Sequence, residues 1–191
     1  MSTASNERRR IHPYKFNLWV AIAAIVMMFA GLTSAYVVRR SQANWFVFSL
    51  PTIFWYSTGV ILVSSLTIHL ALKAFQVRAM QRYRTLITLT AFLGVLFAMM
   101  QFIGFSELQK NGVKLIGQGS NPAASFLAVI TGLHVVHVVG GVIALLIIFI
   151  RAYKVKVKSY SSVPIEIMCT YWHFVDILWI YLFIFFNLVG S

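Results

Sequence analysis

Hydrophobic residues in this chain are grouped into five long, nearly uncharged runs that are separated by short polar segments. The runs cover about residues 18–38, 51–72, 85–105, 123–150 and 167–190. A helix of about 20 residues crosses roughly 30 Å of hydrocarbon. None of the runs shows the period-two alternation of a barrel strand, and in lipid a helix satisfies its own backbone. The pattern therefore predicts an all-α, polytopic membrane protein with five transmembrane helices in one bundle.

The segments between the runs leave no room for a soluble domain. We expect residues 17–191 to form one five-helix transmembrane domain. Residues 1–16 are polar for most of their length and are expected to form a mobile N-terminal tail on the cytoplasmic side.

Composition supports a membrane location, since 60% of the residues are hydrophobic and only 10% are charged. Sixteen Lys and Arg against four Asp and Glu give a net charge of +12, which in a soluble chain would suggest nucleic acid binding. Twelve of these cations fall in the N-terminal segment and in the segments 73–84 and 151–165. The positive-inside rule therefore predicts a cytoplasmic N-terminus and an outer C-terminus, and no nucleic acid partner is expected.

The start of the chain also resembles a secretory signal, because three arginines at 8–10 precede an apolar run that ends near Thr33-Ser34-Ala35. The run is longer than the apolar core of a signal peptide, and Arg39 and Arg40 follow it. These features favour a first transmembrane helix, and processing within residues 1–35 is left open.

Ionisable residues inside the apolar runs are candidates for function, because each costs about 2.5–3.5 kcal/mol on insertion scales. They are His69, His134, His137, His173 and Asp176. Three interpretations compete: a metal or haem site, a proton relay, and a hydrogen-bonded network that fixes helix register. The network is favoured, with Asp176 accepting from His137 or from a neighbouring Trp or Thr.

The last apolar run carries most of its polar side chains on one helical stripe, which we expect to face the other helices. The stripe consists of Cys169, His173, Asp176, Ile177, Ile180, Ile184 and Asn187, and the aromatic residues of this run fall on the other faces. Gly132 and Gly140 in the preceding run are expected to allow close helix approach. Because the chain has one cysteine, it excludes an intramolecular disulfide and a Cys-cluster metal site.

The stretch Tyr171-Trp172-His173-Phe174-Val175-Asp176, followed by Trp179, is similar to the signature that closes subunit III of cytochrome c oxidase and of related haem-copper oxidases. Further agreement comes from residues 131–134, His137-Val138 and Gly140, from Glu166, and from Gln101 and Glu107. The resemblance covers about residues 17–191. Five helices rather than seven identify the short bacterial form.

The resemblance implies a non-catalytic subunit of an aa3-like, proton-pumping oxidase in the bacterial plasma membrane. Such a subunit holds no redox centre, packs against subunit I, binds phospholipid and supports proton uptake. Haem and copper are then expected in the partner subunits I and II. The electron donor, cytochrome c or quinol, and membership of a larger respiratory supercomplex are left open.

Eight residues are carried over from the resemblance as a lipid-binding or structural seam, with no catalytic or metal-binding role. They are His134, His137, Glu166, Tyr171, Trp172, His173, Asp176 and Trp179. The chain departs from the family pattern at three positions: Ile25 and Gly104 replace glutamates, and Val135 replaces a glycine.

A small proton-coupled transporter is the alternative function. In that interpretation His134, His137 and Asp176 carry the proton across the membrane.

Overall fold

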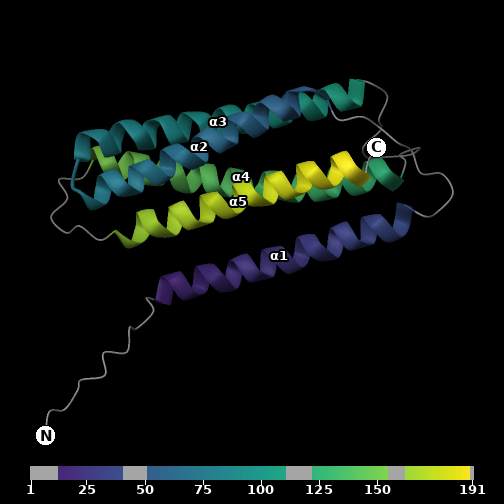
Figure 1. Ribbon diagram of the computed structural model, residues 1–191, viewed down its shortest axis with the longest axis horizontal. Helices are drawn as coiled ribbons and strands as arrows, with labels where there is room; N and C mark the ends of the chain where they lie inside the picture. Colours follow the sequence, from purple (N-terminus) through teal and green to yellow (C-terminus); the bar gives the residue numbers. More distant parts are fainter. Residues whose placement is uncertain (1–12, 41–50, 111–121, 155–161, 190–191) are drawn as a thin grey trace, which may run out of the picture.

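The computed structural model describes residues 13–40, 51–110, 122–154 and 162–189, and each of these segments is built around helix (Figure 1). The helices are α1 (Pro13–Arg40), α2 (Ile53–Gln76), α3 (Met80–Lys110), α4 (Pro122–Lys154) and α5 (Val163–Val189). All five are long and apolar enough to cross a membrane. The prediction of an all-α membrane protein with five spanning helices is confirmed.

The helices extend beyond the apolar runs at most of their ends. α3, for example, begins at Met80 and ends at Lys110, five residues outside the predicted run on each side. Basic side chains at such ends reach the polar interface while their stems cover apolar surface, so the helix continues past the hydrocarbon. α1 likewise includes residues 13–16, which we had placed in the tail. Residues 1–12 lie outside the described part of the chain, so the tail stays a prediction.

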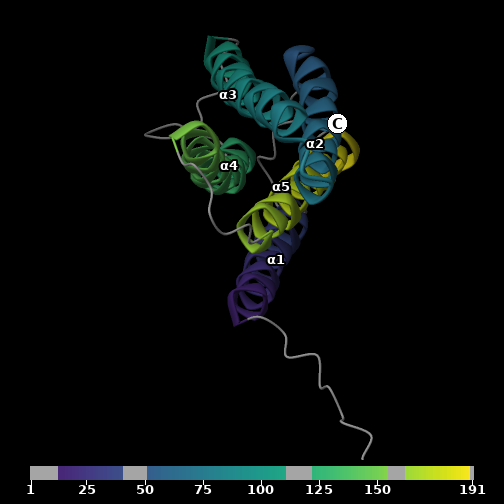
Figure 2. The same cartoon turned by 90° about the vertical axis from the view of Figure 1, so that its left-hand side faces the viewer.

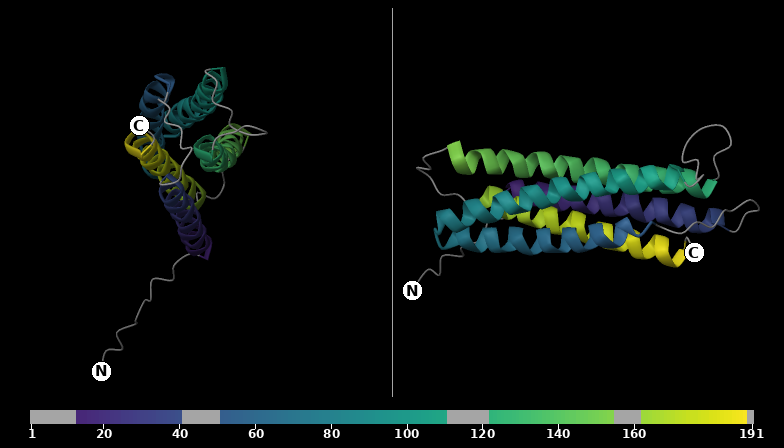
Figure 3. Two further views of the ribbon diagram at one scale, coloured as in Figure 1. Left: turned by 90° about the vertical axis from the view of Figure 1, so that its right-hand side faces the viewer. Right: turned by 90° about the horizontal axis from the view of Figure 1, so that it is seen from above.

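Successive helices run in opposite directions along the bundle (Figures 1 and 3). A tight turn joins α2 to α3, in which Arg78 takes a left-handed conformation with φ of 58° and Ala79 N–H donates to Ala74 O at 2.9 Å. This alternation brings the start of α1, the α2–α3 turn, the end of α4 and the start of α5 to one end of the bundle. That end carries most of the described Lys and Arg residues, and its cytoplasmic location stays a prediction.

The core is formed by α2, α3, α4 and α5, and α1 lies at the edge (Figure 2). Within the described residues, α1 contacts α4 and α5 but neither α2 nor α3. α5 turns its most buried face toward the other helices, with residues that recur in steps of three and four. They are Ile165, Met168, Trp172, Val175, Trp179, Leu182 and Phe186.

The predicted buried stripe of α5 is correct in its inner half and wrong in its outer half. Cys169 and Asp176 are buried, but Ile177, Ile184 and Asn187 are exposed. The buried face follows a period of 3.5 residues, as in helices that supercoil gently around one another, and the polar side chains of α5 do not follow this period. Four of the aromatic residues that were expected on the other faces, Trp172, Trp179, Phe183 and Phe186, are buried instead.

Candidate functional site

Trp172 occupies a slot between α3 and α4 that only glycines leave open. A Cβ atom at Gly94 would lie 2.9 Å from the indole Cη2 atom, and one at Gly141 would lie 2.9 Å from the Cζ3 atom. The indole ring is fully buried. Gly132 and Gly140 were predicted to allow close helix approach, but no atom of the described residues lies within 4 Å of where a Cβ would stand at either position. For the described part of the bundle, that prediction was wrong.

Hydroxyl groups on the core-facing side of α2 hydrogen-bond to ring nitrogens of α5. We call Thr58, Ser64 and Ser65 the hydroxyl row. The three bonds run from Trp179 Nε1–H to Thr58 Oγ1 (3.0 Å), from Trp172 Nε1–H to Ser64 Oγ (3.1 Å), and between Ser65 Oγ and His173 Nδ1 (2.6 Å). Because α2 and α5 are antiparallel, Thr58 near the start of α2 pairs with Trp179 far along α5, and the serines further along α2 pair with residues nearer the start of α5.

Two further bonds connect the same helix to α3. Thr67 and Thr90 share a bond of 2.9 Å, and Gln101 Nε2–H donates to Ser57 Oγ at 3.0 Å. Indole and amide N–H groups that are buried without partners would be costly, so these contacts fix the register of the core helices.

The two histidines of α4 have different environments and do not act as a pair. His134 is fully buried, its ring stacks on Trp179 with centroids 5.3 Å apart, and neither ring nitrogen has a hydrogen-bond partner among the described residues. His137 is partly buried and donates from Nδ1 to Leu133 O at 2.7 Å. Its carbonyl oxygen accepts from the Tyr171 hydroxyl at 3.0 Å.

Asp176 does not accept a hydrogen bond from any of the donors that we had expected. Both carboxylate oxygens are buried and unpaired within the described residues. Ser65 lies beside this carboxylate but in a geometry that does not complete a hydrogen bond. The indole N–H groups of Trp172 and Trp179 donate to the hydroxyl row, and His137 donates to a carbonyl oxygen of its own helix. Of the residues predicted to form the network, His173 is hydrogen-bonded to another helix. The prediction was wrong for Asp176 and His134, which have no hydrogen-bond partner among the described residues.

Glu166 lies at the start of α5 and connects that helix to α1. One carboxylate oxygen accepts from Lys15 Nζ at 2.5 Å and the other from Ser162 Oγ at 2.5 Å. Ser162 immediately precedes the helix, and its carbonyl oxygen accepts from Glu166 N–H at 3.0 Å. The carboxylate therefore lies in the first turn of α5, where a negative charge is favourable, and it also binds a cation from a neighbouring helix.

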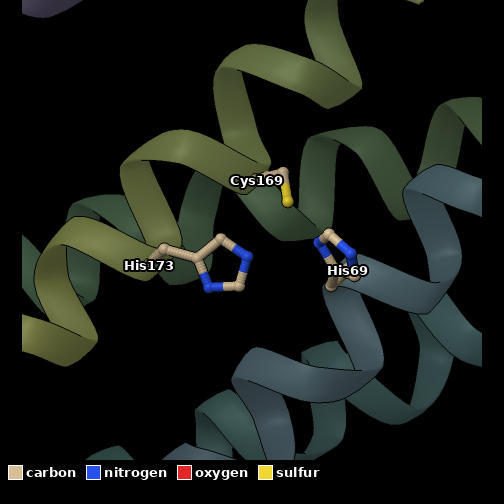
Figure 4. A group of neighbouring side chains, drawn as sticks. All are labelled: His69, Cys169 and His173. Carbon is tan, nitrogen blue, oxygen red and sulfur yellow. The ribbon is translucent and has the colours of Figure 1, made fainter.

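One side-chain group was missed by the sequence reasoning. His69 on α2 and Cys169 and His173 on α5 bring one potential ligand atom each to within 4.8 Å of one another (Figure 4). The i, i+4 spacing of the cysteine and the histidine was visible in the sequence. The antiparallel pairing that adds His69 depends on helix packing and was not.

The fold and these contacts define a polytopic helical membrane protein whose core is held by small residues and buried polar side chains. The sequence profile of the family "Cytochrome c oxidase subunit III" matches residues 12–191. This chain belongs to that family. It is accordingly a multi-pass protein of the bacterial plasma membrane with the role of subunit III of a haem-copper oxidase, and it assembles with other oxidase subunits.

Curated relatives agree along nearly the whole length. A probable cytochrome c oxidase subunit 3 of Nocardia farcinica is 30% identical, with 92% of this chain and 90% of the relative covered. Cytochrome c oxidase subunit 3 of Bacillus sp. PS3 is 27% identical, with 90% and 84% covered. Subunit 3 of a cytochrome bo(3) ubiquinol oxidase from Buchnera aphidicola is 28% identical, with 92% and 86% covered.

Two of the three departures from the family pattern have a structural setting. Ile25 is partly buried and packs against the hydrophobic core. At Gly104, a Cβ atom would lie 2.8 Å from Phe54 Cζ and 2.9 Å from Ile53 Cγ2. The start of α2 therefore occupies the space that a glutamate side chain would need at this position.

Proposed function

We propose that the chain is the non-catalytic subunit III of an aa3-like, proton-pumping oxidase, in which it stabilises subunit I, binds phospholipid and supports proton uptake. Family membership carries the subunit role. The remaining parts of the proposal are supported by two features of the structure: an apolar groove beside α1, and buried titratable side chains in the core.

The groove supports phospholipid binding. It has a volume of about 800 Å³ and lies between α1, α4 and α5. Its lining is almost entirely apolar and comprises Tyr14, Asn17, Leu18, Gly140, Ala144, Ile147, Ile148, Val163, Pro164, Ile167, Met168 and Tyr171. The Lys15–Glu166 ion pair belongs to residues adjoining this lining. An acyl chain matches the groove, and the polar residues at the helix starts match a headgroup.

Tyr171 is the member of the carried-over set that lies in this groove. Its ring lines the cavity, and its hydroxyl donates to His137 O. We therefore assign Tyr171 to lipid contact, and Trp172, Trp179 and His173 to the packing and register of the core.

The support for proton uptake is the burial of Asp176 and His134 without hydrogen-bond partners within the described residues. Buried unpaired ionisable groups inside a membrane are typical of sites that exchange protons or interact with a partner subunit. No hydrogen-bonded path among the described residues links His134, His137 and Asp176, and this favours the subunit role over the transporter.

Purification tests the subunit role directly. The tagged chain, extracted from native membranes, should bring down larger subunits that contain haem and copper. Recovery of a lone, haem-free protein, with normal oxidase activity in a strain that lacks the gene, would contradict it. In liposomes that contain only this chain, we expect no proton-coupled transport by the wild type. The variant Asp176→Asn should therefore show no difference from it.

A filled groove tests the lipid assignment. Ala144→Phe places a ring in the cavity, whereas Val136→Phe changes an exposed position on the same helix that is not part of the lining. We expect the first variant to lose co-purified phospholipid and the second to retain it, as measured by mass spectrometry of the intact complex. Equal lipid content in the two variants would refute the assignment.

A further inference from the structure

The group of His69, Cys169 and His173 lies outside every role assigned so far. Cys169 is buried, His173 is partly buried and His69 is exposed, so the group opens to the outside of the described fold on one side. The rings of His69 and His173 face each other at a tilt, with centroids 6.0 Å apart (Figure 4). Their nitrogens and the thiol sulfur are the ligand atoms of zinc sites.

Two rigid helices fix the positions of these ligands. Cys169 and His173 are one turn apart on α5 and project from the same side of it. His69 reaches them from the antiparallel helix α2, whose pairing with α5 is set by the hydroxyl row. The site is therefore formed by the packing of the core and does not depend on a loop.

Ser65 orients His173 for ligation. It holds Nδ1 at 2.6 Å, and the ring edge that carries Nε2 is turned toward Cys169 and His69 (Figure 4). When Nδ1–H donates to the serine oxygen, Nε2 presents its lone pair to the group. The serine hydroxyl is then able to turn to the adjacent Asp176 carboxylate. Partners that fix the tautomer of a ligating histidine in this way are a regular part of metal sites.

We propose that His69, Cys169 and His173 bind one Zn²⁺ ion, with a water molecule as the fourth ligand. Tetrahedral coordination at about 2.0–2.3 Å requires the ligand atoms to lie roughly 3.5 Å apart. The ligand atoms lie up to 4.8 Å apart in the structure, and small side-chain rotations would shorten these distances to about 3.5 Å. On binding, the Cys169 thiol releases one proton and its sulfur bonds to the metal.

The ligand set of two imidazole nitrogens and one thiolate, with a fourth position for water, is one that Zn²⁺ commonly takes. No described cation is bonded to Cys169 or to Asp176. Bound metal would link α2 to α5 at the end of the bundle where the hydroxyl row stops.

Zinc content per chain tests the proposal. The complex that contains the tagged chain is stripped with a chelator and dialysed against radioactive Zn²⁺, for the wild type and for His69→Gln and Cys169→Ser. We expect each variant to bind one zinc ion fewer per chain than the wild type. Ser65→Ala should keep the ion but weaken its binding by about 10- to 100-fold.

His137→Gln is the matched control, because that histidine lies outside the group and should retain the full zinc content. His69→Gln changes an exposed side chain, so it decides the result if Cys169→Ser fails to assemble. Equal zinc content in the wild type and in His69→Gln overturns the proposal. The proposal is also overturned if these variants reduce the amount of bound Cu⁺ but not the amount of bound Zn²⁺. Loss of haem from the preparation at unchanged zinc would count against the oxidase role and not against this site.

Discussion

α1 and α2 both cross the bundle with one face toward their neighbours, but different contacts hold them. In the apolar part of α1 only 17% of residues are buried, against 33% for α2 and 44% for α5. α2 is joined to α3 and α5 by indole, imidazole, hydroxyl and amide groups that find partners at several depths. The polar contacts of α1 with α5 include those of Lys15, near the start of α1, and of Thr33, about three quarters of the way along it.

The difference follows from the solvent. Lipid chains are as apolar as leucine, so burial of apolar surface gives little drive for helices to associate in a membrane. Close packing and hydrogen bonds must supply it instead, and α2 through α5 have both. α1 has fewer buried residues than α2, α3 or α5, its contacts include the bonds of Lys15 and Thr33, and the groove lies beside it. A loosely held helix next to an acyl-sized cavity suits a subunit that binds lipid at this point.

The strongest test of the packed core is the slot around Trp172. We expect Gly141→Leu to destabilise the protein by about 3 kcal/mol, because the new side chain meets a fully buried indole that Gly94 and α3 prevent from moving. The fraction of complex that remains assembled after heating measures the effect. Gly132→Leu adds the same side chain to the same helix at a position where a Cβ would meet no atom of the described residues, and it should cost far less.

The main anchor of α1 is the fully buried Tyr36, whose ring contacts Phe126, Phe185 and Phe186 at centroid distances of 5.4–6.3 Å. Tyr36→Ala should cost about 2 kcal/mol, mostly as lost dispersion contacts. The loss should release α1 while the core stays folded, so limited proteolysis should cut near α1 first. Val37→Ala, at an exposed neighbour, should leave the pattern unchanged. Simultaneous loss of core and α1 would show that the two regions are not distinct.

Sequence alone predicted the number and type of the helices, because length and uncharged character are enough to identify spans in a membrane. Trp172 and Trp179 were named by resemblance, and Thr58 and Ser65 were visible as polar positions of the second run.

The hydrogen-bond partners of these side chains could not be predicted from the sequence, because they depend on the relative rotation and axial position of the antiparallel helices. The buried stripe of α5 was predicted from the positions of polar side chains, and this criterion failed. A Trp side chain can also be buried among the helices, because its indole N–H donates a hydrogen bond to a hydroxyl group of a neighbouring helix. Gly94 and Gly141 likewise look no different from Gly132 in the sequence, and only the position of Trp172 separates them.

A single bond of the hydroxyl row can be measured by a double-mutant cycle. Trp179→Phe and Thr58→Val each remove the bond between indole Nε1 and Oγ1. We expect a coupling of about 0.6–1 kcal/mol in detergent unfolding, which is the usual size for hydrogen bonds between membrane helices. The pair Trp179→Phe and Thr88→Val is the control, since Thr88 bonds to Tyr153 and not to α5. Coupling in the control pair would attribute the effect to general repacking.

The smallest effect is expected at the Lys15–Glu166 ion pair, whose side chains are 42% and 25% exposed. Lys15→Gln should weaken the attachment of α1 by only a few tenths of a kcal/mol, because exposure screens the pair and ordering the lysine costs entropy. The difference between wild type and variant should shrink as salt rises from low to high ionic strength. Proteolysis rates near α1 measure it. A large, salt-independent effect would mean that this pair, and not the Tyr36 ring, holds α1 to the core.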